Sequence, residues 1–285
     1  MVPPTLLRAR SFAGASAIFL MGYAGLSAVL FYVTLLYQGA NGWSVLRTGL
    51  SWLLMNAPFL LMAQFAGRLD RRFPAAAVAA TGCLVAALGI FALSVAGTTT
   101  PFAVTALGYL LSGAGSGTLL PATTHAAMRD VPAGVSGAAS GVLNAARQIG
   151  SSVGLAVLGA IGVHAAVSDW QATAARFPAQ LRATALAQGQ NVGGARIDAV
   201  TRALGATYRN PAGQSFVHGY HLAVGAAAAC LLAAAVVAVV GFGRHSPAPE
   251  PEAQLPAAGR LPNDQAPGEG LLGPHAEAQP SRRWR

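Results

Sequence analysis

Charged residues are scarce in this sequence. They make up 9% of its 285 residues, whereas roughly a quarter of a soluble domain is charged. Lysine is absent, so all 18 basic residues are arginine, and five of these follow residue 243. The net charge of +9 is spread over many segments and forms no basic stripe, which argues against nucleic acid as a partner. We therefore expect this protein to lie in a lipid bilayer and not in water.

Cysteine is almost absent too. Cys83 and Cys230 each lie within an apolar run, where a thiol behaves as a small hydrophobic side chain, and their spacing indicates neither a disulfide nor a metal site. The sequence also brings together no nucleophile, base and orienting carboxylate, and no group of residues with metal-ligand spacing. We therefore expect neither an enzyme nor a protein with a metal or another cofactor.

Long apolar runs dominate what is present, and 54% of the residues are hydrophobic. A helix needs about 20 apolar residues to cross a bilayer, because every backbone polar group must be satisfied within the segment. Six runs fit: 12–37, 49–66, 75–96, 101–123, 136–163 and 216–242. The predicted fold class is therefore all-α, a polytopic membrane protein with a bundle of six transmembrane helices in residues 12–243.

The arginines predict the orientation of these spans in the plasma (inner) membrane. With the lead-in 1–11 placed in the cytoplasm, eight arginines flank the spans on the inner side and one lies in the short outward loops, although the outward segment 164–215 adds five. Both termini are therefore expected to be cytoplasmic. The outward segment is expected to form short helices, one of them at 197–204, that cover the outer mouth. The tail 244–285, with eight prolines, is expected to be disordered.

One cluster of charge interrupts the apolar runs, between the second and third spans. We expect it to form a short turn, and its residues are Gly67, Arg68, Asp70, Arg71 and Arg72. One interpretation is a gating latch, in which Asp70 complements a helix N-terminus and the arginines pair with carboxylates or lipid phosphates. The other interpretation is a plain topology anchor on the cytoplasmic side.

Small residues spaced four apart predict close contacts between helices. Gly113 and Gly117 in the fourth span fit this pattern, and Pro121 is expected to kink or end that helix. In the fifth span the candidates are Gly137, Gly141, Gly150 and Gly154. Two interpretations remain open, a pliable helix that bends during transport and static tight packing.

The fifth span also carries a polar stripe. At 100° per residue, one side holds Ser140, Asn144, Arg147, Gln148 and Ser151, while Val142, Ile149 and Val153 lie opposite and are expected to face lipid. The polar residues are candidates for lining the substrate pathway, and interhelical hydrogen bonding is the alternative. Asn56 and Gln64 of the second span have the same two interpretations.

Arg147 is the only Asp, Glu, Lys or Arg within any predicted span. It lies about 16 Å along its helix from Ser136, at a depth where an arginine is costly unless it meets a cavity or a partner. Because the spans contain no carboxylate, the expected partners are backbone carbonyls, Asn144, Gln148, water, or a carboxylate on another polypeptide.

These residues resemble the major facilitator superfamily, and within it the fourteen-helix drug:proton antiporter subfamily. The resemblance covers about the first 240 residues. Its most specific part looks like the next-to-last helix of that subfamily together with the segment before it, and comprises 113–121, Val131, Pro132, 137–141, Asn144, Arg147, Gln148, Gly150, Gly154 and 156–159. The charged cluster is similar to the family's loop motif, although Gly67 and Asp70 are three apart where the family usually has four.

The resemblance implies that the six spans correspond to the carboxy-terminal half of such a transporter, which pairs two six-helix bundles around a central site. The implied function is multidrug-efflux-like export of amphipathic small molecules by alternating access, with a second six-helix half or another copy of the chain as partner. Proton coupling would then reside in that missing or partner half. The alternative is a truncated or accessory membrane fragment without transport activity of its own.

Overall fold

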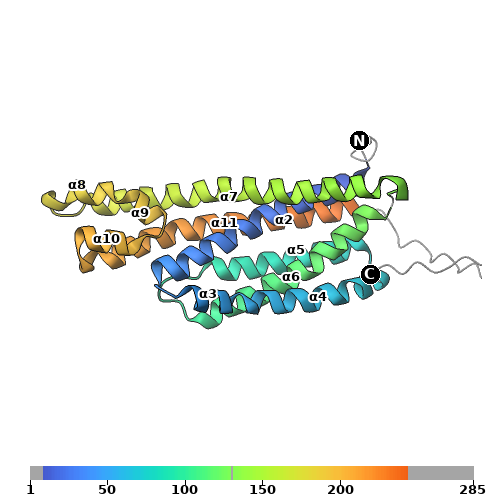
Figure 1. Cartoon of the computed structure of the whole chain (residues 1–285), viewed down its shortest axis with the longest axis horizontal. Helices are drawn as coiled ribbons and strands as arrows, with labels where there is room; N and C mark the ends of the chain where they lie inside the picture. Colours follow the sequence, from blue (N-terminus) through green and yellow to red (C-terminus); the bar gives the residue numbers. More distant parts are fainter. Residues whose placement is uncertain (1–8, 130, 243–285) are drawn as a thin grey trace, which may run out of the picture. The chain divides into compact units, whose positions relative to one another are not determined.

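The computed structural model describes residues 9–129 and 131–242, which are helical with no strand among them (Figure 1). The predicted tail 244–285 and nearly all of the lead-in lie outside these ranges. The long helices are α2 (Arg10–Thr34, continued by the π-helix η1, Leu35–Ala40), α4 (Leu53–Arg72), α5 (Ala75–Ser94), α6 (Phe102–Met128), α7 (Ser136–Ala174) and α11 (Arg209–Phe242). The shorter ones are α3 (Val45–Ser51), α8 (Ala179–Ala187), α9 (Gly189–Gly193) and α10 (Ile197–Leu204), with 3₁₀ turns at Ala133–Val135 and Ala206–Tyr208.

Within the described residues, six helical segments are long and apolar enough to cross a membrane. They are Arg10–Ala40, Val45–Leu69, Ala75–Ser94, Phe102–Met128, Ser136–Ala174 and Ala206–Phe242. The expected all-α fold with six spans is therefore confirmed. The lengths of the apolar runs predict this number, because each span has to satisfy its own backbone polar groups along its full length.

The helices pack as two groups of three. In one group α5 and α4 lie on either side of α6, and in the other α2, α7 and α11 contact one another, while α11 also packs along α5 and joins the groups. Glycines allow the closest approaches. A Cβ at Gly115 would overlap backbone atoms of Ala86, and one at Gly154 would overlap Ala24, so neither position has room for a side chain.

Two helices extend beyond their predicted spans. Helix α7 continues to Ala174 instead of ending at 163, and α11 begins at Arg209 instead of 216. The extra turns of α7 are held by a small cap, defined here as residues 164–208. Trp170 is fully buried in the cap and its Nε1 donates to the carbonyl oxygen of Ala185 at 2.7 Å. Helix α7 continues beyond the apolar run because its side chains there pack against other residues of the cap.

The charged cluster does not form the turn expected from the sequence. Gly67, Arg68, Asp70, Arg71 and Arg72 all lie in the last turns of α4, which ends only at Phe73. The residue before a proline avoids helical backbone angles, and Phe73 is accordingly extended, with φ −128° and ψ 151°, just before Pro74. Arg71 and Arg72 occupy the last turn, where positive charge complements the helix dipole.

Candidate functional site

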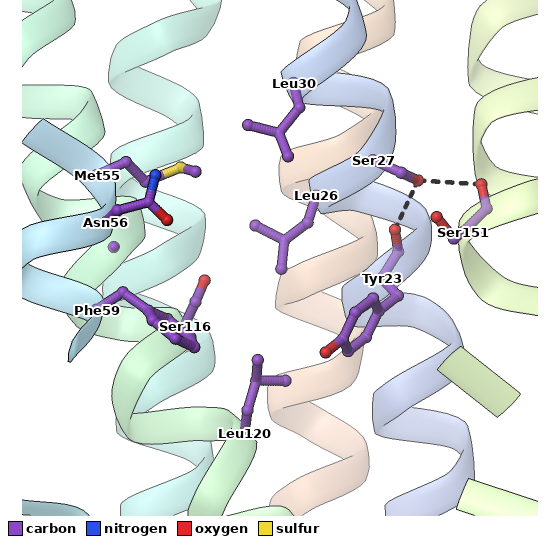
Figure 2. A pocket seen from close by; sticks show the side chains of 11 residues that line it. Tyr23, Leu26, Ser27, Leu30, Met55, Asn56, Phe59, Ser116, Leu120 and Ser151 are labelled. Carbon is purple, nitrogen blue, oxygen red and sulfur yellow. Dashed lines mark hydrogen bonds between the residues drawn. The ribbon is translucent and has the colours of Figure 1, made fainter. Parts of the chain in front are cut away.

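A cavity of about 320 Å³ lies among α2, α4, α6 and α7 (Figure 2). It is lined by Tyr23, Leu26, Ser27, Leu30, Met55, Asn56, Phe59, Gly113, Ser116, Leu120 and Ser151. Figure 2 shows the side chains of α4 facing Leu26 and Leu30 of α2 across the cavity. A space of this size, apolar with a few polar groups, is typical of a site for a small organic ligand.

Two glycines set the wall of the cavity that α4 and α6 form. A Cβ at Gly113 would overlap the carbonyl oxygen of Met55, and one at Gly117 would overlap that of Phe59. The α4 backbone therefore rests directly on α6, and the Met55 and Phe59 side chains project past it into the cavity. Helix α6 runs on past Pro121 to Met128, so the proline does not end the helix as one of the two expectations had it.

The opposite wall is fixed by a hydroxyl. Ser27 Oγ of α2 donates to its own helix at the Tyr23 carbonyl oxygen (2.7 Å) and lies 3.0 Å from the Ser151 carbonyl oxygen of α7 (Figure 2). This contact joins α2 to α7 beside the cavity. Two further polar groups belong to the lining. The Ser116 hydroxyl is buried and has no hydrogen-bond partner among the described residues, and the exposed Asn56 carboxamide only donates to its own helix.

Arg147 lies next to this cavity, in a group of side chains that we call the Arg147 cluster: Arg147, Thr124, Phe19 and Tyr23. Arg147 Nη2 donates to Thr124 Oγ1 at 3.0 Å, and its Cζ lies 4.1 Å from the ring centroid of Phe19 and 5.9 Å from that of Tyr23. The electron-rich ring faces offset part of the cost of burying a guanidinium. Nε is buried with no acceptor among the described residues.

Thr124 and Phe19 were not among the partners expected for Arg147, which were backbone carbonyls, Asn144, Gln148, water, or a carboxylate on another polypeptide. Asn144 and Gln148 are both exposed on α7. Ser140 is exposed as well and donates to the carbonyl oxygen of Ser136, one turn back in its own helix. The orientation of α7 about its own axis explains these contacts. The side of α7 that packs on α2 carries small residues such as Ala146 and Gly150, and Arg147 lies at the edge of that side, from which its side chain extends past α2 toward α6.

Some of the remaining predicted residues line the cavity or contact α2, and the others do neither. Asn56 and Ser151 line the cavity, whereas Gln64 is exposed two turns further along α4. Gly150 and Gly154 lie against α2, where an added Cβ would overlap Leu20 and Ala24 respectively. Gly137 and Gly141 have no atom of another described segment within 4 Å of an added Cβ, so the expectation that they pack against a neighbouring helix in this bundle is wrong. Both face away from α2 and α11.

Sequence reasoning missed Tyr23, Ser27, Phe59 and Ser116 as cavity residues. A usable signal exists for two of them, because Tyr23 and Ser27 stand one turn apart in an otherwise apolar span and therefore share a face. Ser116 stands among glycines and was therefore interpreted as part of a small-residue packing pattern. Phe59 has no sequence feature that distinguishes it from an aromatic residue that faces lipid. Their role depends on where α2 and α4 sit relative to α6, which periodicity within one helix does not contain.

The sequence model of the Major Facilitator Superfamily matches residues 2–155, more than half of the chain. The tetracenomycin C resistance and export protein of Streptomyces glaucescens is 28% identical over 149 residues, covering 52% of this chain and 28% of that protein. The multidrug resistance protein Stp of Mycobacterium tuberculosis is 32% identical over 161 residues, covering 56% and 30%. The methylenomycin A resistance protein of Streptomyces coelicolor is 31% identical over 176 residues, covering 61% and 36%.

The alignments with these three relatives thus span about a third of each relative's length. All three are named for resistance or export, which agrees with the resemblance seen in the sequence. The matched region contains α2 to α6 and the part of α7 that carries Arg147 and Ser151. With its six apolar helices and this match, the chain is a multi-pass membrane protein and belongs to the Major Facilitator Superfamily of transporters.

Proposed function

We propose that this chain forms one six-helix bundle of an exporter for amphipathic small molecules, working by alternating access in the plasma membrane. The single observation that carries the proposal is the cavity among α2, α4, α6 and α7, with apolar walls and the unpaired Ser116 hydroxyl. The names of the relatives support export of drug-like compounds. Substrate would enter this cavity, contact Tyr23, Phe59 and Asn56, and leave on the other side of the membrane.

A partner completes the proposed transporter. Asn56 and Gln64 of α4, and Asn144 and Gln148 of α7, are exposed on helices that cross the membrane. An amide is unfavourable against lipid hydrocarbon and is usually covered by protein or water. These faces therefore favour contact with a second six-helix half or another copy of the chain, and proton coupling would reside in that half. If no such partner exists, the chain is instead an accessory fragment without transport.

Orientation and gating belong to the same proposal. We place the end of α4 with Arg68, Arg71 and Arg72 on the cytoplasmic side and the cap outside. Arg68, Arg71 and Arg72 are exposed there and are available to pair with carboxylates of a partner bundle or with lipid phosphates, as a gating latch requires. Reporter fusions after residues 73 and 190 test the orientation: alkaline phosphatase is expected to be active only in the second fusion.

The export function is tested by accumulation of a fluorescent drug in an efflux-deficient bacterial host that carries the gene in its own operon. The expected result is lower accumulation than in the host with an empty vector. The matched control is Ser116→Leu, which fills the cavity at an otherwise buried position and should restore accumulation without lowering the amount of protein in the membrane. Equal accumulation with the wild-type gene and the empty vector would favour the accessory fragment.

A further inference from the structure

The Arg147 cluster lies just beyond one end of the cavity. Three members of the cluster stand four positions, or one helical turn, from a residue that lines the cavity on the same helix, and the fourth, Tyr23, is itself a lining residue. The pairs are Arg147 and Ser151 on α7, Thr124 and Leu120 on α6, and Phe19 and Tyr23 on α2. One turn is about 5.4 Å. Because the same offset of one turn holds on all three helices, the guanidinium lies just beyond the cavity, between the same three helices.

Among the described residues, no carboxylate forms an ion pair with Arg147. A guanidinium stays protonated in proteins, and none of the six predicted spans contains Asp or Glu. Arg147 uses one N–H on Thr124, and the ring of Phe19 stacks on the guanidinium without neutralising it. Nε is buried without an acceptor among the described residues. A positive charge with a spare donor therefore lies just beyond a largely apolar cavity, one helical turn from residues that line it.

We propose that the cavity selects organic anions, namely amphipathic aromatic compounds that carry a carboxylate or phenolate. This inference rests on the proposed export function and names the substrate class of the same site. The anionic group accepts hydrogen bonds from Arg147, whose planar fork suits a carboxylate, while the aromatic body packs between Leu26 and Phe59. Ser116 is placed to bond a hydroxyl or carbonyl group of the ligand.

The same arrangement disfavours lipophilic cations. A cation in the cavity would lie near an unneutralised guanidinium with no carboxylate on any predicted span to balance it. The low local dielectric strengthens that repulsion compared with water. The volume of about 320 Å³ lies near the lower limit of ligand pockets, which range from about 300 to 1,000 Å³, and so favours compact ring systems over long chains.

A matched pair of dyes tests this selection directly. Fluorescein is anionic and rhodamine 123 is cationic, and both have the same xanthene ring system. Binding of each dye to the purified full chain in lipid nanodiscs is measured by fluorescence anisotropy, with empty nanodiscs subtracted. We expect fluorescein to bind about tenfold more tightly than rhodamine 123, as one charge-assisted hydrogen bond can provide.

Three variants assign that preference to the guanidinium. Arg147→Gln should weaken fluorescein binding about tenfold and leave rhodamine 123 binding unchanged or improved, and Arg147→Lys, which keeps the charge but loses the fork, should fall between it and the wild type. Arg176→Gln removes an exposed arginine of the cap and should change neither dye. Circular dichroism and gel filtration show whether each variant folds, and the preference of the wild-type chain remains a test if Arg147→Gln does not.

Two results overturn the inference while leaving the proposed export function intact. One is tighter binding of rhodamine 123 than of fluorescein by the wild-type chain. The other is a folded Arg147→Gln variant that binds fluorescein as the wild type does, which would make the Arg147 cluster a structural tie between α2, α6 and α7. Failure of the wild-type chain to bind either dye overturns the anion site and the proposed use of the cavity together.

Discussion

Replacement of Gly113 by alanine is the sharpest test of how α4 is held in the bundle. The added Cβ would overlap the carbonyl oxygen of Met55, and a backbone atom cannot rotate away as a side chain can. The two helices must separate, and overpacking of this kind costs about 1–3 kcal/mol. Because α4 packs chiefly on α6, few other contacts resist the separation. We therefore expect lower thermal stability in detergent and a wider cavity.

Gly141→Ala is the matched control for that variant. Gly141 is also a glycine within a long helix, but no atom of another described segment lies within 4 Å of an added Cβ. Alanine favours helix over glycine by about 0.5–1 kcal/mol, so this variant should be slightly more stable than the wild type. Because the same gain in helix propensity applies to Gly113→Ala, the two variants should differ by the overpacking cost alone, about 1–3 kcal/mol. Thermal unfolding followed by intrinsic fluorescence measures the difference, and equal stability of the two would refute the close α4–α6 contact.

Three further outcomes follow from the site and the cap. Arg147→Ala should reduce efflux of the exported dye with little loss of protein from the membrane, since its burial is only partial; unchanged efflux would remove Arg147 from the pathway. A cysteine at Asn144 should react with a water-soluble maleimide and one at Ile149 should not, whereas equal labelling would contradict the assignment of faces on α7. Trp170→Phe should cost about 1 kcal/mol by removing the indole hydrogen bond to the Ala185 carbonyl oxygen, which would still accept from the Gln188 N–H, and limited proteolysis should then cleave the cap faster.

Local sequence patterns predict much of this fold. The six spans follow from the length of the apolar runs, because the membrane requires each helix to be continuous. The close contacts at Gly113 and Gly154 involve positions that spacing alone had singled out. Where patterns within one segment failed, the deciding contacts came from elsewhere: α7 continues past residue 163 because the cap covers Trp170, and α4 continues through the charged cluster because only Phe73, before proline, ends it.

The candidate site was predictable only in part. The depth and isolation of Arg147 can be derived from one helix, and so can the shared face of Ser151. The partners of Arg147 cannot be derived in this way, since Thr124 is 23 residues away and Phe19 is on the first span. The cavity itself arises where four helices fail to fill the space between them. No pattern within a single helix encodes that failure.

Because α7 is continuous from the cavity to the cap, a tilt of this helix would displace the part of the cap that it carries. About 35 Å of continuous helix separates Arg147 from Trp170, so a tilt of about 10° around the arginine moves the indole by about 6 Å. Trp170 is held against Ala185 and Phe177, and in a variant that keeps it as the single tryptophan its fluorescence would register such a displacement without any added label. Occupancy of the cavity between the helices would thereby change the surroundings of an indole in the cap.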